Sequence, residues 1–285
     1  MSDDIYSRKI QDTPIVVFDF ETTGFTPRAG DEIIEIGALK SLGGKIVETY
    51  ETLVNPIRPI SQGASEVNGI TRDMVANAPL IEDALPELLK FIGECPLTAH
   101  NAAFDLSFLA WKMAEMGLPE KSNPVFDTML LSRALNPTFY NHKLGGIIAQ
   151  LGIEMTVGHR ALSDAEATHA VLQKMLAPYA ADGELTVARA LSLQGGPVAW
   201  PGFRHAEVTP GPETEIEAAI RLAIERGGTV VIEYQTMGSD KPTKREIRPI
   251  HLSRRPVRTY LIADCLLRNA QRIFRVDRIA NIIEP

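Results

Sequence analysis

The sequence predicts an α/β protein whose first two thirds form a mixed sheet flanked by helices, followed by a small, strongly bent β domain or barrel. Short apolar strands come first and then alternate with amphipathic helical patterns, an order typical of a sheet with mixed strand directions. A run rich in Gly and Pro then interrupts the chain near residue 200. Beyond it, one helical pattern precedes several short strands separated by turn residues, which favours the bent sheet or barrel.

Hydrophobic periodicity gives the expected elements of both parts. Residues 15–20 are a short, apolar, β-rich run, and residues 33–39 and 45–54 flank a turn as a hairpin. Further strands are expected at 97–99, 125–126, 229–235, 246–252, 259–265 and 272–276. Helices are expected at 81–92, 102–116, 144–151, 165–176 and 214–226.

The Gly/Pro run marks the expected domain boundary. Between residues 195 and 212, eight of eighteen residues are Gly or Pro, a composition that holds neither a helix nor a central strand. The sequence therefore predicts four segments: an N-terminal tail at 1–13, an α/β domain at 14–181, a linker at 182–212 and a second domain at 213–285.

Charge is distributed unevenly along the chain. Residues 1–180 hold 14 bases and 23 acids, whereas residues 241–285 hold 11 bases and four acids. The acidic front argues against binding a polyanion through bulk charge unless metal ions mediate the contact. The basic end can meet phosphates directly, and the alternative is the solvated surface of a small β domain.

Other features of the 285-residue sequence indicate a soluble protein of the cytoplasm. No run of about 18 apolar residues exists to span a membrane. The first ten residues carry acids and no apolar stretch, unlike a signal peptide. Cys95 and Cys265 lie in different halves of the chain and are expected to be reduced packing residues.

A pair of acidic residues is the first feature of the sequence that indicates a metal-binding site. Asp19 and Glu21 lie two residues apart on a predicted strand, so their side chains share one face. Two carboxylates at the end of an apolar strand repel each other and are poorly solvated unless a cation joins them. Mg²⁺ and Mn²⁺ prefer such oxygen ligands. The alternative is an exposed strand end with ordinary surface acids.

Three more residues extend this pattern. Asp105 comes near the start of a predicted helix, where an acid also serves simply as a favourable end charge. His159 precedes Asp164 by five residues, and Ser163 with Glu166 forms a capping-box signature that predicts a helix start there. The alternative for the histidine is an ordinary residue of a surface loop.

The segments F-D-F-E-T-T-G, H-N-A-A-F-D and H-R-A-L-S-D-A together resemble the three motifs of DnaQ-like 3′–5′ exonucleases of the DEDDh type, the family of the DNA polymerase III epsilon subunit. The resemblance covers residues 14–180 and implies a ribonuclease H-like fold. The segment N-G-I-T at 68–71 resembles the H-G-I-T often found in the epsilon-like branch, with Asn68 in place of His.

The resemblance implies roles for the matched residues. Hydrolysis of a phosphodiester needs an activated water and relief of charge on the phosphoryl and leaving oxygens, which two cations about 3.5–4 Å apart supply. The expected holders of two divalent ions, Mg²⁺ or Mn²⁺, are Asp19, Glu21 and Asp164, completed by Asp105. His159 is the expected general base. Thr22 and Asn101 are expected at the substrate.

Other acids are expected to have structural roles. Asp31, Glu32 and Glu35 flank a hairpin strand and are expected to be solvated. Asp127 is expected to cap the helix that follows it.

The C-terminal segments A-I-R-L-A-I, V-V-I-E-Y, R-E-I-R-P-I-H-L, R-T-Y-L-I-A-D-C and R-I-F-R-V-D-R-I resemble a WYL domain over residues 213–285, with Thr259 where the family has its tryptophan. The resemblance implies a small Sm- or SH3-like barrel that senses nucleic-acid or nucleotide-type ligands. The candidate ligand contacts are Arg248, Tyr260, Arg272, Arg275 and Arg278. The alternative is that Tyr260 and Phe274 are core residues and the arginines a solvated surface.

The function predicted from the sequence is a metal-dependent exonuclease that releases nucleoside monophosphates from single-stranded or frayed 3′ ends of DNA. The expected partner is DNA, with RNA as an alternative substrate. A non-catalytic nucleic-acid-binding regulatory protein is the alternative of another class. The sequence leaves a polymerase or repair partner, the pathway and the oligomeric state open.

Overall fold

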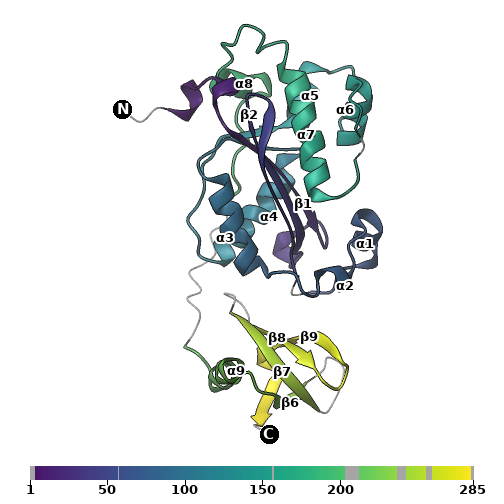
Figure 1. Ribbon diagram of the computed structural model, residues 1–285, viewed down its shortest axis with the longest axis vertical. Coiled ribbons are helices and arrows are strands. Elements are labelled where there is room, and N and C mark those ends of the chain that lie inside the picture. The colour runs from purple at the N-terminus through teal and green to yellow at the C-terminus, as the bar shows by residue number, and fades with distance from the viewer. Residues whose placement is uncertain are drawn as a thin grey trace. The chain divides into compact units, whose positions relative to one another are not determined.

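The computed structural model describes residues 4–56, 58–155, 157–202, 212–235, 242–254 and 259–283. The chain divides into two compact units, Met1–Phe203 and Arg204–Pro285 (Figure 1). None of the helices in the described ranges combines the length and the apolar character that crossing a membrane requires.

The first unit is built on a five-stranded mixed sheet with the strand order β3-β2-β1-β4-β5. Strands β1, β2 and β3 pair antiparallel, whereas β4 and β5 run parallel to β1. The bounds are β1 Ile15–Thr22, β2 Ile33–Leu42, β3 Lys45–Leu53, β4 Leu97–Ala99 and β5 Val125–Asp127. The expected mixed α/β sheet and its N-terminal hairpin are therefore confirmed.

Helices cover both faces of this sheet, because β1 is apolar on both sides. Phe18 and Phe20 pack into a core with α3 and α4, whereas Val17 packs against Ala165 of α7 on the opposite face. The helices are α1 Gln62–Asn68, α2 Arg72–Val75, α3 Ile81–Ile92, α4 Ala102–Glu115, α5 Thr128–Leu135, α6 Leu144–Leu151, α7 Ala161–Leu176 and α8 Val187–Leu193, with single 3₁₀ turns at Ile5–Ser7, Ile10–Asp12 and Pro27–Ala29. Figure 1 shows α7 running alongside β1 and β2.

The expected tail and much of the expected linker pack as parts of the first unit. The Ile10 N–H donates to the Leu185 carbonyl at 2.8 Å, and the Val187 N–H donates to the Arg8 carbonyl at 3.0 Å. Further on, the Trp200 indole Nε1 donates to the Asn123 carbonyl at 2.9 Å. Residues up to 202 therefore contribute to this core.

A side chain from the expected linker also covers the edge of the sheet at β5. The Gln194 amide donates from Nε2 to the Val125 carbonyl at 3.0 Å and accepts at Oε1 from the Asp127 N–H at 2.9 Å. The amide thus occupies the hydrogen-bonding groups that a sixth strand would use, which blocks strand addition at this edge.

The second unit contains one helix and an antiparallel sheet with the strand order β10-β6-β7-β8-β9. Their bounds are α9 Glu215–Arg226, β6 Val230–Tyr234, β7 Thr243–Arg254, β8 Thr259–Cys265, β9 Ala270–Arg275 and β10 Ile279–Ile283, with a 3₁₀ turn at Val276–Arg278. Strands β9 and β10 lie at opposite ends of this order, and no pairing closes the sheet within the described residues. The expected closed barrel is therefore not confirmed.

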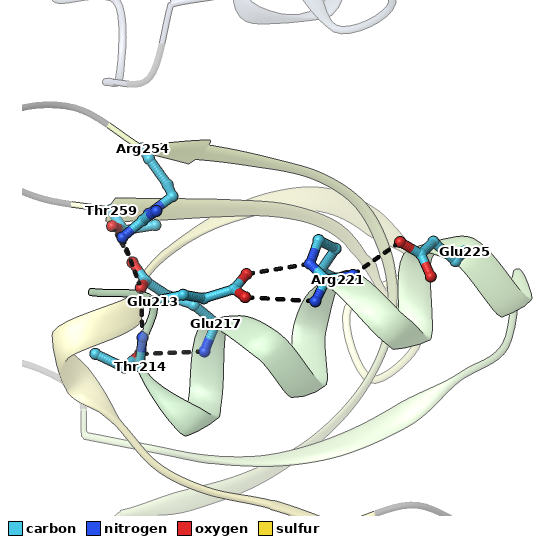
Figure 2. Close-up of polar contacts among 7 residues, drawn as sticks. All are labelled: Glu213, Thr214, Glu217, Arg221, Glu225, Arg254 and Thr259. Carbon is cyan, nitrogen blue, oxygen red and sulfur yellow. Dashed lines mark hydrogen bonds and ion pairs between the residues drawn. The ribbon is translucent and has the colours of Figure 1, made fainter. Parts of the chain in front are cut away.

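Helix α9 packs on its sheet through Ile220 and Ala223, and one buried acid, Glu217, adds polar contacts (Figure 2). Thr214 and Glu217 form a capping box, and the Thr259 hydroxyl donates a hydrogen bond to Glu217 Oε1. Arg254 Nη2 lies 3.4 Å from Glu217 Oε2. Burial alone would raise the pKa of Glu217, but the hydrogen bonds from Thr259 and Thr214 and the charge of Arg254 outweigh burial and lower it. Thr259, at the family's tryptophan position, is therefore a polar anchor for α9.

Candidate active site

Strand β1 places Asp19 and Glu21 on the face of the sheet that packs against α7. Asp19 pairs directly with Gly37 on β2, and Glu21 pairs directly with Glu35. Side chains of directly paired residues point to the same side of a sheet, so Glu35 and both predicted metal ligands share this face.

Asp105 reaches the same strand from the other layer. It is buried on the first turn of α4, and its Oδ1 accepts a hydrogen bond from the Phe20 N–H at 3.1 Å. The register of β4 on β1 covers Val16 and Val17, so Phe20 lies beyond the paired stretch. Asp105 therefore contacts the backbone between Asp19 and Glu21, which is more than the helix-end role that the sequence also allowed.

His159 and Asp164 complete the group from the α7 side. Glu21, His159 and Asp164 each offer a ligand atom, and these atoms lie within 4.8 Å of one another. His159 is exposed with a left-handed φ of 49°, while the buried Asp164 accepts from the Gly158 N–H at 3.1 Å. The loop thus returns over Glu21 before α7 begins.

The predicted start of this helix is wrong. Helix α7 begins at Ala161, and its N-cap residue, Arg160, makes no side-chain capping hydrogen bond. The acceptor comes from another strand, because the Ala161 N–H donates to Glu35 Oε2 at 2.9 Å. Ser163 lies inside the first turn, so the capping-box signature did not mark the boundary.

The electrostatics of the site favour binding of cations. Burial, followed by the charges of Asp105 and Glu21, raises the pKa of Asp19 well above its ordinary value. Burial and the charge of Asp164 raise the pKa of Glu21 to about 7. Burial is also the main cause of the raised pKa values of Asp105 and Asp164. Poorly solvated carboxylates that repel one another suit hard divalent ions, so these residues fit the metals that the family resemblance implies.

Asn68 contacts this site through Glu21. Its side-chain hydrogen bond to Glu21 lowers the pKa of that carboxyl, against the larger effect of burial. Asn68 is itself buried, and its Oδ1 accepts from the Ile70 N–H at 3.0 Å. The residue that replaces the family's histidine therefore touches a candidate metal ligand.

The prediction that Glu32 and Glu35 are solvated is wrong. Glu35 is fully buried, and Arg160 Nε donates to both of its oxygens at 2.9 and 3.1 Å. Glu32 is also buried, with its Oε2 3.0 Å from the ammonium of Lys112 on α4. Asp31 is half-buried and pairs with Arg58 at 2.8 Å. Each acid is neutralised by a cation that lies far away in the sequence.

The two predicted substrate contacts, Thr22 and Asn101, lie at the end of β1 and just before α4. The Thr22 hydroxyl donates to the Gly24 carbonyl at 2.6 Å and so shapes the turn after Glu21. Asn101 is exposed with a left-handed φ of 61°, and its N–H donates to Asp127 at 3.1 Å. Asp127 accepts from two backbone N–H groups of α5 as well, so its predicted capping role is confirmed.

An exposed aromatic residue close to the acids in the sequence was not identified by the sequence analysis. Phe25, four residues after Glu21, is 86% exposed, and its ring centroid lies 6.4 Å from that of Phe104 on α4. A Phe in a glycine-containing turn next to paired acids was the available signal. An exposed ring of this kind can stack on a nucleobase.

The candidate residues of the second unit do not form a single set. Tyr260 on β8 pairs with Arg275 on β9, and the Arg275 guanidinium is held by Asp277. Arg248 pairs with Asp264, which places it on the same face as Tyr260. Arg272 and Phe274 occupy the other face, where Phe274 is a core residue. Arg278 lies in the turn before β10.

The sequence of the chain matches two known protein families. Residues 16–172 match the family model described as Exonuclease (RNase_T). The chain belongs to this exonuclease family. Residues 215–283 match the WYL domain model, so both predicted resemblances are confirmed.

Curated relatives of the exonuclease unit are DNA polymerases of the PolC type. The chain is 42% identical over 165 residues to the DNA polymerase III PolC-type of Halalkalibacterium halodurans, covering 58% of this chain and 11% of the relative. It is 47% identical over 161 residues to that of Caldanaerobacter subterraneus subsp. tengcongensis, covering 56% of this chain and 11% of the relative. The chain thus spans about a tenth of the length of these relatives.

Solved structures of exonucleases share the fold. Exonuclease X, solved in complex with 5′ overhanging duplex DNA, is 29% identical with a TM-score of 0.51, covering 64% of this chain and 99% of the other. The nuclease domain of 3′hExo, a DEDDh family member bound to rAMP, is 22% identical with a TM-score of 0.52, covering 65% of this chain and 97% of the other. The second likeness shows the fold alone.

Proposed function

We propose that this exonuclease is a metal-dependent 3′–5′ enzyme that hydrolyses the terminal phosphodiester of DNA and releases nucleoside monophosphates. The observation that carries the proposal is the convergence of Asp19 and Glu21 from β1, Asp105 from α4 and Asp164 from α7. Each of these carboxyls has a raised pKa. Such a cluster is unfavourable in a folded protein unless cations occupy it.

In this proposal Asp19, Glu21 and Asp164 hold divalent ions, Mg²⁺ or Mn²⁺, with Asp105 completing the set. When bound, such ions relieve charge on the phosphoryl oxygens and make water a better nucleophile. Asp105 also fixes the strand, because its hydrogen bond to the Phe20 N–H holds the backbone between the two β1 ligands. The metals explain how an acidic domain accommodates a polyanion.

His159 acts as the general base that takes the proton from the attacking water. Its ring is exposed, and a ring nitrogen lies within 4.8 Å of an oxygen of Glu21 and of Asp164. An imidazole can accept a proton near neutral pH and release it to solvent afterwards.

The 3′-terminal nucleotide is bound between Phe25 and Asn101. Phe25, four residues after Glu21, offers an exposed ring next to Phe104 of α4, Thr22 shapes the intervening turn, and Asn101 is exposed at the start of α4. DNA is the proposed substrate, since exonuclease X, at 29% identity, is solved in complex with DNA and the curated relatives are DNA polymerases.

We further propose that residues 213–285 act as a separate domain that contacts nucleic acid. Arg248, Tyr260 and Arg275 share one face of its sheet, where cationic and aromatic groups can contact phosphate and base. The proposal includes a cytoplasmic location, in keeping with the free cysteines Cys95 and Cys265.

A substrate panel tests the proposed activity. Single-stranded DNA, duplex DNA with a 3′ overhang and the matching RNA are incubated with Mg²⁺ or Mn²⁺, and the products are separated by chromatography. The expected products are 5′-nucleoside monophosphates, formed faster from DNA. Faster release from RNA would mean that the enzyme acts on the 3′ ends of RNA. Binding without release under every condition would favour the regulatory alternative.

A further inference from the structure

The start of helix α7 lacks a cap of its own. Arg160, its N-cap residue, contributes no side-chain acceptor, yet the first-turn N–H of Ala161 is paired with Glu35 Oε2 at 2.9 Å. Arg160 Nε donates to both oxygens of the same carboxylate, at 2.9 and 3.1 Å. One acid on β2 therefore holds both the backbone and the side chain of the two residues that follow His159.

Burying the charge of Glu35 at this site is unfavourable unless other groups compensate it. It is fully buried and directly opposite Glu21, in a site already crowded with carboxylates. A buried carboxylate is tolerated when its charge and its lone pairs are fully matched, and such matched groups fix geometry closely. The guanidinium of Arg160 supplies the matching charge, and its exposed side also approaches Glu51 at 3.9 Å.

Gly37 allows the backbone of α7 to pack closely against strand β2. A Cβ at this residue would come 2.1 Å from the Leu162 backbone N, so the first turn of α7 rests directly on strand β2. Glu35 and Gly37 are two residues apart and face the same side. Strand β2, which pairs with β1, thus also fixes the position and direction of α7, the helix that carries Asp164.

The loop before α7 contains a residue, His159, whose backbone conformation needs contacts that hold it in place. His159 has a φ of 49°, a left-handed conformation that costs energy for a residue with a Cβ and persists when neighbours over-determine it. On one side the Gly158 N–H is held by Asp164 at 3.1 Å. On the other side Arg160 and Ala161 are held by Glu35.

We infer that Glu35 is a positioning residue: through Arg160 and Ala161 it holds His159 over Glu21 in the orientation that catalysis uses. The inference rests on the proposed role of His159 as the base. Glu35 itself touches neither the substrate nor the reacting atoms. Misplacing a catalytic group by about 1 Å can cost on the order of 100-fold in rate, so loss of this support is measurable.

Glu35→Gln tests the inference, because the amide keeps the size of the side chain and one acceptor while losing the charge. The expected result is a kcat lower by about 10- to 100-fold with KM within about threefold. In a His159→Ala background the same substitution is expected to lower the residual rate by no more than about twofold, since residues that act through one another are non-additive. Glu48→Gln, which removes an exposed partner of Lys40, is the matched control and is expected to leave the rate unchanged.

Binding of Mn²⁺, measured by titration calorimetry without substrate, separates positioning from damage to the metal site. Glu35→Gln is expected to keep the Mn²⁺ dissociation constant within about threefold, because Asp19, Glu21 and Asp164 are retained. Arg160→Lys, at a residue with an exposed side chain, repeats the test if Glu35→Gln unfolds. It keeps the charge but loses the two-pronged contact, so it is expected to lower kcat in the wild-type background only.

Two results would overturn the inference. One is an equal loss of rate from Glu35→Gln in the wild-type and His159→Ala backgrounds. The other is a loss of Mn²⁺ affinity as large as the loss of rate, which would assign the effect to the metal ligands. If His159→Ala alone keeps full activity, the proposed role of the histidine fails first, and that result is read independently of Glu35.

Discussion

Glu21 on β1 and Glu35 on β2 lie directly opposite each other, and the two carboxylates have different partners. Glu35 is matched by Arg160 and by the Ala161 N–H. Glu21 meets Asp164, whose like charge adds to burial in raising its pKa to about 7. One acid of the pair is thus committed to holding the structure, and the other is left available for a cation.

The stability of the metal-free protein is expected to fall as the pH rises. The pKa of Glu21 is raised from 4.5 to about 7, so between these values the folded chain keeps a proton that the unfolded chain releases. Folding is therefore favoured at the acid end of this window and loses that contribution by about pH 7. Asp19, Asp105 and Asp164 shift in the same direction.

Thermal unfolding in EDTA at pH values from 5 to 8 measures this effect. Glu21→Gln is expected to flatten the dependence, because the amide does not titrate. Saturating Mg²⁺ is expected to raise the unfolding temperature more at pH 8 than at pH 5.5. A midpoint that climbs steadily from pH 5 to 7 in EDTA would be inconsistent with poorly solvated site carboxyls.

Asp19→Asn is expected to abolish hydrolysis and to stabilise the metal-free fold. The substitution removes a proposed metal ligand, and it also removes a carboxylate whose charge is opposed by burial, Asp105 and Glu21. Activity and the unfolding temperature in EDTA are measured side by side. Glu87→Gln on the surface of α3 is the control, expected to change neither. An Asp19→Asn protein with wild-type rate would rule out the proposed metal ligands.

Gly37→Ala is expected to destabilise the protein and to lower activity together. The added methyl would overlap the backbone at Leu162, and overpacking of this kind costs about 1–3 kcal/mol. Gly63→Ala in α1 is the control, because its Cβ would meet nothing within 4 Å. Denaturant unfolding of both variants checks this, and an unchanged midpoint for Gly37→Ala would mean that α7 does not rest on β2.

The exonuclease unit is expected to fold when the chain ends at residue 202 and to fail when it ends at 181. The shorter chain loses the buried Leu185 and Leu191 and the edge cover provided by Gln194. Circular dichroism and thermal unfolding of the two fragments provide the comparison. A cooperative transition for the fragment 1–181 equal to that of 1–202 would show that residues 182–202 are dispensable.

Arg248→Ala combined with Arg275→Ala is expected to weaken binding of long single-stranded DNA and to flatten its salt dependence. Each lost phosphate contact lowers the slope of log affinity against log salt by roughly 0.7 for single strands. Arg221→Gln is the control, since this arginine lies on α9 and not on the sheet, and its guanidinium is paired with Glu213, just before the helix, and with Glu225 within it (Figure 2). If the double variant matches the wild type in affinity and slope, this face does not hold DNA.

Much of the fold followed from sequence periodicity, because amphipathic patterns are local. Helix α3 begins and ends at the predicted residues, and the β2–β3 hairpin was expected. The boundary of α7 was not predictable in this way, since its capping acceptor, Glu35, lies more than a hundred residues earlier in the chain. Local signals such as Ser163 and Glu166 cannot reveal a cap supplied by another strand.

The residues of the candidate site were likewise predicted only in part. Spacing on a strand suggested that Asp19 and Glu21 share a face, and motif resemblance added Asp105, His159 and Asp164. The burial of Glu35 and Glu32 was missed, because it depends on Arg160 and Lys112, cations brought to them only by the fold. The closed barrel of the second unit was expected from resemblance, whereas its strand order is open at β9 and β10 within the described ranges.

The central proposal is tested most directly by following a 5′-labelled single-stranded DNA oligomer with Mg²⁺ over time. The expected result is a ladder that shortens stepwise from the 3′ end, stops in EDTA and does not form with Asp19→Asn. Immediate release of the labelled 5′ nucleotide, or an unchanged ladder in EDTA, would contradict it.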